Sequence, residues 1–210
     1  MHGQWANLPA AVYTRTMTGA GFFTAFSWRQ AGVAIAAALV LQALVLHAMG
    51  HPLICTCGRL TFWNGDPAGP ESSQQLTDWY SWTHVVHGML FYALLRWLLP
   101  DTPFPPRLAL AAGLEAGWEV LENTPPVMER YRQTALAAGY FGDSVVNSLS
   151  DTVMALAGVV LAWRLPVRTS IVFAVVVELW LGFAIRDNLI LNIVELVWPS
   201  QALSDWQMRR

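Results

Sequence analysis

The chain has 210 residues, of which 55% are hydrophobic and only 12% are charged, and its formal net charge at pH 7 is −2. So few charged side chains cannot cover the surface of an ordinary water-soluble domain, and the scattered arginines do not form the basic face that nucleic-acid binding requires. The composition therefore predicts an all-α membrane protein and excludes a nucleic acid as its partner.

The first 28 residues lack a clean apolar core followed by a small-residue cleavage site, so we do not expect a removable signal peptide. The first long apolar run predicts a transmembrane helix over residues 29–49. Arg15 and Arg29 precede this run, and the enrichment of positive charge in cytoplasmic segments places residues 1–28 in the cytoplasm. We expect residues 29–206 to form one transmembrane domain.

Residues 50–77 are rich in Gly, Pro, Ser and Asn and predict a loop, which faces the periplasm in this topology. The loop contains Cys55 and Cys57, the only cysteines of the chain. They are compatible with a metal-binding C-x-C, a redox pair, or two loop cysteines that are buried or bonded elsewhere. A direct bond between cysteines two positions apart is expected to be strained, and the chain has no further sulfur ligand for a usual zinc site.

The second expected helix covers residues 79–99 and begins with an aromatic belt. His84 and His87 follow the belt at a spacing that directs both imidazoles to one face. They can bind a ligand, or they can form hydrogen bonds between helices. A proline-rich cytoplasmic turn separates this helix from a shorter third helix over residues 108–123.

The third expected helix carries Glu115, Glu119 and Glu122 within about 60° of arc. Carboxylates at this spacing repel one another, and the repulsion grows where the dielectric constant is low. A cation, protons or other polar groups must therefore neutralise them. The following loop contains Arg130 and Arg132, which can close over the acids, hold an anionic headgroup or remain solvated.

The fourth expected helix, residues 143–163, has an acidic and amide face in its first half and an apolar second half. Asp143, Asn147 and Asp151 recur every four residues and so share one side of the helix. A charged side chain near the middle of a bilayer costs roughly 3 kcal/mol, so this polar face must meet partners.

The fifth expected helix covers residues 170–186 and has Glu178 alone at its centre. The next apolar segment, residues 188–198, is too short to span a bilayer comfortably. We expect a re-entrant or interfacial helix at the outer face. It would bring Arg186 toward the polar residues of the second, third and fourth helices. A sixth, short span is the alternative.

Because successive membrane helices alternate in direction, the polar faces of the second, third and fourth helices fall in the outer half of the membrane. They predict a shared pocket open to the periplasm, and imidazole and carboxylate groups are ligands of divalent metals such as zinc, manganese or iron. The candidate metal ligands are His84, His87, Glu115, Glu119, Glu122, Asp143, Asn147 and Asp151. The candidate catalytic residues are Glu119, His87 and Asp143, and the candidate anion-binding residues are Arg130, Arg132 and Arg186.

Several motifs resemble those of a bacterial inner-membrane family, domain-of-unknown-function family 2585, over about residues 46–206. They are CTCG (55–58), SSQQLTDWYSWTHVVHG (72–88), EAGWEVLEN (115–123), ERYR (129–132), GDSVVNSLSDT (142–152) and RDNLILN (186–192). The resemblance implies a multi-pass protein of the bacterial inner membrane and little about chemistry. The family often has His where this chain has Gln75, which makes Gln75 a poor candidate ligand. The order of His, Glu-rich and D-x7-D helices is also loosely similar to VanZ-type glycopeptide-resistance accessory proteins.

Two classes of function fit these features. One is an enzyme, a hydrolase or transferase, whose pocket binds one or two divalent cations and activates water against a lipid or lipid-linked substrate in the outer leaflet. The other is a non-catalytic protein that binds or transports a solute, proton or cation, or that has a structural accessory role in the membrane.

Overall fold

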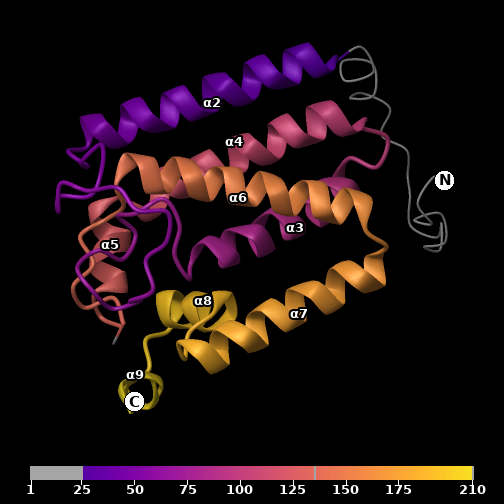
Figure 1. The fold of residues 1–210 in the computed structure, drawn as a ribbon. Coiled ribbons are helices and arrows are strands. Elements are labelled where there is room, and N and C mark those ends of the chain that lie inside the picture. The colour runs from indigo at the N-terminus through magenta and orange to yellow at the C-terminus, as the bar shows by residue number, and fades with distance from the viewer. Residues whose placement is uncertain (1–25, 135, 210) are drawn as a thin grey trace.

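The computed structural model describes residues 26–134 and 136–209, and they confirm the all-α fold (Figure 1). The helices are α2 (Trp28–Ala48), α3 (Ser81–Leu98), α4 (Phe104–Glu122), α5 (Pro125–Tyr131), α6 (Val145–Arg164), α7 (Val167–Ala184), α8 (Leu189–Val197) and α9 (Gln201–Met208). Within the described ranges, β pairing is limited to one bridge between Trp63 and Thr77. Most of the expected cytoplasmic segment, Arg15 included, lies outside the described residues.

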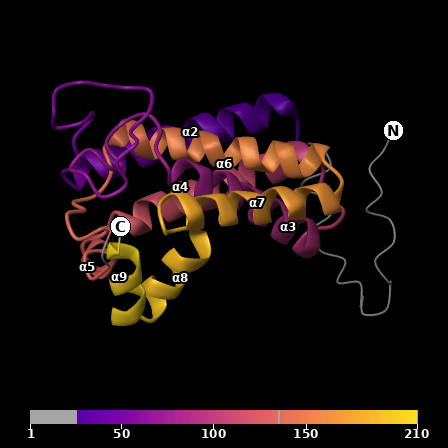
Figure 2. The same ribbon diagram turned by 60° about the horizontal axis from the view of Figure 1, so that its bottom comes forward.

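The long helices α2, α3, α4, α6 and α7 lie side by side and alternate in direction along the chain (Figure 1). Helices α3 and α6 run one way, whereas α2, α4 and α7 run the other way. The loop of residues 50–77, α5, α8 and α9 gather at one end of the bundle, and Figure 2 places them at the same end from a second direction. The two short connections, residues 99–103 and 165–166, lie at the opposite end.

Among the described residues, three helices are long and apolar enough to cross a membrane, namely α2, α6 and α7. Large apolar side chains on α2 and α7, such as Leu41, Leu44, Leu179 and Phe183, are exposed. A lipid environment would cover such surfaces without a cost in hydrophobic free energy. Helices α3 and α4 have similar lengths of 18 and 19 residues but are not in this group: α3 contains two histidines and an arginine, and α4 contains an arginine and three glutamates.

Helices α3 and α6 pack closely at two glycines. A Cβ atom added to Gly88 would lie 1.8 Å from the carbonyl oxygen of Ala155, and one added to Gly158 would lie 2.0 Å from the carbonyl oxygen of Val85. Each glycine therefore faces the backbone of the other helix, and small residues allow this approach between membrane helices. The contact matters for the site because His84 precedes Val85 on α3.

Some expected boundaries were wrong for local reasons. Helix α4 begins at Phe104 rather than near residue 108, because proline is tolerated in the first helical turn, where N–H groups have no partner in the helix. The segment expected as a loop from 124 to 140 contains α5, which likewise starts with proline. Helix α6 begins only at Val145, with the Ser144 side chain as its N-cap, so Asp143 precedes the helix. Helix α9 was not predicted.

Helix α8 is held at both ends by charged side chains. The Glu178 carboxylate accepts hydrogen bonds from the backbone N–H groups of Leu189 and Ile190, at 3.2 and 3.1 Å. At the other end, the Arg130 guanidinium donates to the carbonyl groups of Leu196 and Val197, at 2.7 and 3.0 Å. Both charges have the sign that the helix dipole favours at that end. The contact of Glu178 with the start of α8 explains why α7 carries this acid.

Helix α8 exposes a strongly apolar face that includes Ile190, Val197 and the following Trp198. With nine and eight residues, α8 and α9 extend about 14 and 12 Å, far less than the roughly 30 Å of a hydrocarbon core. Neither α8 nor α9 is therefore long enough to span a membrane.

Candidate functional site

The centre of the candidate site is an imidazole from α3 between two carboxylates from α4. Nδ1 of His84 lies 2.5 Å from Oε1 of Glu115 and 3.3 Å from Oε1 of Glu119. His87, one turn further along α3, has its Nδ1 atom 3.6 Å from Oε2 of Glu115. Both glutamates have 0% exposure. The polar faces of α3 and α4, which were expected to share a pocket, are therefore in direct contact.

Helix α6 closes the cluster from a third side. Asp151 places Oδ2 4.0 Å from Nε2 of His84, and its Oδ1 accepts a hydrogen bond of 2.6 Å from the hydroxyl group of Ser81. Ser148 donates a hydrogen bond of 2.6 Å to Oε2 of Glu119. Three buried carboxyl groups on two helices, Glu115 and Glu119 on α4 and Asp151 on α6, therefore surround the imidazole of His84.

Gln42 connects α2 to this network and was missed in the sequence. Its Nε2 atom donates to the hydroxyl oxygen of Ser148 at 2.7 Å, and its Oε1 atom accepts from the hydroxyl group of Thr152 at 3.0 Å. An amide in the middle of an apolar helix is itself a signal of a buried partner, because an unpaired polar group in a membrane is costly. The sequence could not reveal which helix supplied that partner.

Several polar atoms in the cluster lack a hydrogen-bond partner. They include Nδ1 of His87, Oε2 of Glu115 and Oε1 of Glu119, all buried. Buried polar atoms are normally paired, and each unpaired atom costs about 1–3 kcal/mol. These atoms lie 3.3 and 3.6 Å from an ionisable partner without a hydrogen bond, which is the arrangement expected of a site for a cation, protons or water.

Within this cluster of the described chain, two groups of residues have the spacing of a metal site. Ligand atoms of His84, Glu119 and Glu122 all lie within 4.8 Å of one another, and the same holds for His84, His87 and Glu115. Mixed imidazole and carboxylate ligands suit zinc, manganese and iron. The described geometry is therefore compatible with a divalent metal and identifies His84 as the residue shared by both groups.

A cavity of about 100 Å³ adjoins the cluster and has room for several water molecules. It lies between α3, α4, α8, the 50–77 loop and the segment after α5. Its acidic and imidazole lining comprises His84, His87, Glu122, Asp143, Asp151 and Asp187. No arginine or lysine belongs to the lining among the described residues. The cavity therefore favours a cation over an anion.

Asp143 lines the cavity but is separate from the central cluster. Its carboxylate accepts hydrogen bonds of 2.6 Å from the Asn123 side chain and 2.9 Å from the Tyr140 hydroxyl group. Burial raises the pKa of the Asp143 carboxyl, although both hydrogen bonds favour its ionised form. His51 further links this corner by contacts with the carbonyl oxygens of Asp143 and Asn123, at 3.1 and 3.2 Å.

The regularly spaced polar residues near the start of α6 thus meet three different partners. Asp143 bonds to Asn123, and Asp151 faces His84, whereas the Asn147 side chain donates to the carbonyl oxygen of Gln75 at 2.9 Å. Asn147 does not line the cavity. This hydrogen bond fixes the 50–77 loop to α6.

The three candidate anion-binding arginines have other contacts and do not line the cavity. Arg130 binds the end of α8, as described above. Arg132 donates to the carbonyl oxygen of Tyr140 at 2.6 Å, and Arg186 donates to that of Trp206 at 2.8 Å. Their observed contacts hold the surrounding loops and α9 in place.

Asp187, between α7 and α8, supplies a pH-sensitive contact at the cavity wall. Its carboxylate accepts from the Tyr80 hydroxyl group at 3.1 Å and from the Asn192 side chain at 3.2 Å. Burial raises the pKa of this carboxyl from 3.8 to about 7. Between these pH values the folded protein binds a proton that the unfolded chain releases. The contribution of Asp187 to stability therefore falls as the pH rises from about 4 to 7 and is constant above that range.

We expect Asp187→Asn to remove this part of the pH dependence, because asparagine resembles the protonated acid. At pH 8 the variant should be more stable than the wild type, by at most roughly 4 kcal/mol, the equivalent of three pKa units. Thermal unfolding of both proteins in detergent between pH 5 and 8 measures the effect. The exposed Asp205→Asn change is the control, and identical pH profiles for Asp187→Asn and wild type would contradict the prediction.

Taken together, the bundle and its buried imidazole–carboxylate cluster define an all-α protein with three apolar helices compatible with membrane insertion and a polar site at one end. The chain belongs to the family described as "Protein of unknown function (DUF2585)", whose match covers residues 46–209. This confirms the resemblance identified from the sequence motifs.

Relatives from other bacteria are similar over most of their length. A UPF0314 protein of Sphingopyxis alaskensis is 46% identical over 177 residues, which cover 84% of this chain and 94% of the relative. A UPF0314 protein of Rhizobium meliloti is 46% identical over 169 residues, covering 80% and 86%. One from Paracoccus denitrificans is 44% identical over 169 residues, covering 80% and 88%. No solved structure matches the chain significantly.

Proposed function

We propose that the protein spans the bacterial inner membrane five times, through α2, α3, α4, α6 and α7, with α8 at the outer surface. The alternating helix directions support this topology. So does the distribution of charge, because the helix ends opposite the site carry Arg29, Arg96, Arg107, Arg164 and Arg168. Positive charge favours the cytoplasm, so the N-terminus is cytoplasmic and the cavity opens to the periplasm.

This topology predicts that the loop of Cys55 and Cys57 is accessible from outside the cell. After mild reduction, a membrane-impermeant maleimide should label the exposed Cys57 in intact cells. The matched control is Asp101→Cys in a variant whose two native cysteines are serine, because residue 101 lies in the connection at the opposite end of the bundle. That control should react only after permeabilisation. The reverse labelling pattern would invert the topology.

The proposed function is that of a metal-dependent hydrolase or transferase acting on a lipid or lipid-linked substrate in the outer leaflet. The observation that carries it is the buried group of His84, Glu119 and Glu122, whose ligand atoms lie within 4.8 Å of one another beside a cavity. An acidic cluster alone would be weak support. Here Oε1 of Glu119 is also buried without a hydrogen-bond partner, as an unfilled ligand position would be.

A divalent cation held by these three side chains would lower the pKa of bound water and supply a nucleophile. His87 lines the cavity and its Nδ1 atom makes no hydrogen bond, so this imidazole would serve as the proton acceptor beside such a cation. The cation would also provide positive charge for an anionic substrate group, which the lining of the cavity lacks. The apolar face of α8 borders the lipid and gives a lipid-linked substrate a route to the cavity.

A second candidate is non-catalytic binding or transport of a cation, proton or solute. The specific observation in its favour is the charge of the cavity lining, which contains acids and imidazoles but no arginine or lysine within the described chain. Such a lining attracts a cation without any need for a phosphate-bearing substrate. The two functions differ in whether the bound cation supports turnover.

The deciding experiment combines metal analysis with an activity screen. The protein is purified in detergent with and without a chelator, its zinc, manganese and iron contents are measured, and it is incubated with a bacterial lipid extract analysed by mass spectrometry. Stoichiometric metal and a metal-dependent product that Glu119→Gln does not form would support the enzyme. Stoichiometric metal without a product would support the binding or transport function. Absence of metal, together with no uptake from solution, would contradict a metal-dependent function.

A further inference from the structure

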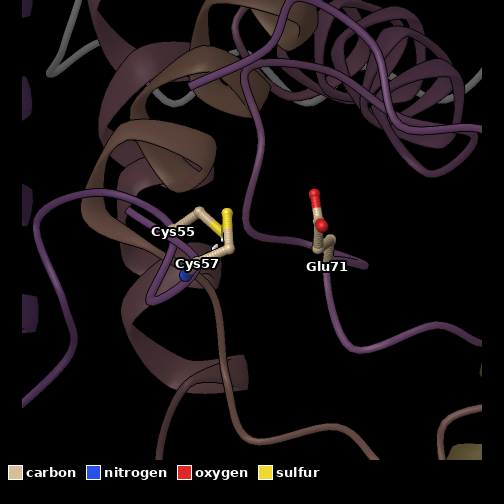
Figure 3. Close-up of side chains that lie close together, drawn as sticks. All are labelled: Cys55, Cys57 and Glu71. Atoms are coloured by element: carbon tan, nitrogen blue, oxygen red, sulfur yellow. Dashed lines mark hydrogen bonds between the residues drawn. A yellow bond between two sulfur atoms is a disulfide. The ribbon is translucent and has the colours of Figure 1, made fainter. Parts of the chain in front are cut away.

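The 50–77 loop contains a further group of reactive side chains, Cys55, Cys57 and Glu71, which shares no residue with the two groups around His84. Cys55 and Cys57 are joined by a disulfide, and Glu71 lies beside it (Figure 3). Of the alternatives left open by the sequence, the structure shows the two cysteines bonded to each other, with their Cα atoms 5.2 Å apart, within the range that disulfides bridge. Because the sulfurs are bonded to each other, this form of the loop offers no thiolate ligands.

The two sulfur-bearing residues differ in accessibility. Cys55 is 2% exposed, whereas Cys57 is exposed at the surface of the loop. Thiol–disulfide exchange begins when a thiolate reaches one sulfur atom of the bond and displaces the other. An incoming thiolate can therefore reach Sγ of Cys57, and Cys55 is the leaving group.

Each sulfur atom also accepts a hydrogen bond from an N–H donor. The backbone N–H of Cys57 donates to Sγ of Cys55 at 3.2 Å, and Nε2 of Gln75 donates to Sγ of Cys57 at 3.5 Å. Such donors stabilise a thiolate more than a neutral thiol. A stabilised thiolate leaves faster, so both contacts favour exchange at this bond.

The donor group of Gln75 is held in one orientation. Its Oε1 atom accepts from the backbone N–H of Thr61 at 2.7 Å, and its Nε2 atom donates to Oε2 of Glu71 at 2.7 Å. Arg59 binds the other oxygen of Glu71 at 2.5 Å, and this hydrogen bond lowers the pKa of the Glu71 carboxyl. Gln75 is fully buried, and these two hydrogen bonds hold its amide group against the sulfur atom of Cys57.

We propose that the Cys55–Cys57 disulfide exchanges with dithiol groups of peptides or proteins outside the membrane. A substrate thiolate attacks Sγ of Cys57, the bond between the cysteines breaks, and Cys55 leaves as a thiolate that takes a proton from water. The second substrate thiol, as its thiolate, attacks the substrate sulfur of the mixed disulfide and releases Cys57. The substrate gains a disulfide, losing two electrons, and the pair is reduced to two thiols. Exchange with another disulfide at the same face reverses these steps and restores the pair.

This activity is independent of the metal site, and it agrees with the proposed periplasmic position of the loop. Disulfides persist in the periplasm, whereas the cytoplasm keeps thiols reduced. Failure of either proposal leaves the other standing, because the two groups of residues share no side chain.

The first test compares single-cysteine variants of the full chain in detergent, with oxidised glutathione as the probe. Cys55→Ser retains the exposed Cys57, which should form a mixed disulfide at least about ten times faster than Cys55 in Cys57→Ser. Maleimide blocking followed by intact mass spectrometry measures both rates. Equal rates, or faster reaction of Cys55, would overturn the assignment of Cys57 as the attacked sulfur.

The second test follows the wild-type pair with a reduced peptide that contains two cysteines. We expect one equivalent of peptide disulfide per protein and a reduced Cys55–Cys57 pair. Gln75→Met removes the side-chain donor and should slow the reaction about tenfold, the equivalent of one hydrogen bond to a charged group. The exposed Gln201→Met change should leave the rate unaltered, and thermal unfolding checks that each variant is folded. A wild-type pair that stays oxidised in excess peptide would overturn the proposal.

Discussion

Glu119→Gln is expected to lower the affinity for a divalent cation by at least about 100-fold. Replacing a residue that only hydrogen-bonds to a metal ligand already lowers metal affinity 10–100-fold, and Glu119→Gln changes a candidate ligand itself. The fold should survive, because glutamine keeps an oxygen that accepts the hydrogen bond now made by Ser148 to Glu119. Metal titration and thermal unfolding of the same detergent preparation separate the loss of affinity from a loss of folding.

The control for this change is Glu129→Gln, which neutralises an exposed acid on α5 and should leave the affinity unchanged. The structure further predicts that His84→Ala and Glu119→Gln are strongly non-additive, because their ligand atoms lie 3.3 Å apart and either loss destroys the same site. Asp143→Asn should have a smaller, separate effect, since Asn123 and Tyr140 bind that carboxylate. Equal affinities for wild type and Glu119→Gln would contradict the proposed site.

Gly88→Ala and Gly158→Ala are expected to destabilise the bundle by about 1–3 kcal/mol each, the usual cost of overpacking a close contact. The added methyl group would overlap a backbone carbonyl group of the facing helix, which cannot move without separating α3 from α6. Since α3 carries His84, metal affinity should fall together with stability. Thermal unfolding in detergent and metal titration measure the two effects.

Gly113→Ala on α4 is the matched control, because a Cβ atom there would meet nothing within 4 Å. Alanine favours the helical conformation by up to about 1 kcal/mol over glycine, so this variant should be as stable as the wild type or slightly more stable. If all three alanine variants unfolded alike, the close approach of α3 and α6 would not contribute to stability.

The sequence alone was sufficient for the helical class, the approximate position of every long helix and the end of the bundle at which the polar groups meet. Apolar runs bounded by turn residues mark membrane-length helices, because each buries its own backbone polar groups. The spacing of Glu115 and Glu119 on one helix and of His84 and His87 on another indicated which faces needed partners. Because successive helices alternate in direction, these polar faces were expected at the same end of the bundle.

Only the tertiary structure decided which polar groups touch. The regular spacing of Asp143, Asn147 and Asp151 predicted a common environment, yet each residue meets a different partner. Periodicity reports the direction of a side chain around one helix, whereas a contact depends on the rotation and separation of the neighbouring helix. At Gly88 and Gly158 that separation is set by backbone carbonyl groups, which no pattern of side chains reveals.

The functions of charged residues likewise depended on the fold. Arg130 and Glu178 lie 48 positions apart in sequence and hold opposite ends of α8, a segment that neither precedes nor follows Arg130 closely. Charge and spacing showed that these side chains needed partners, but the partners are backbone groups at helix ends, and every helix has such groups. Which helix end lies within reach is a property of the folded chain, because it follows from how α7 and α8 pack together.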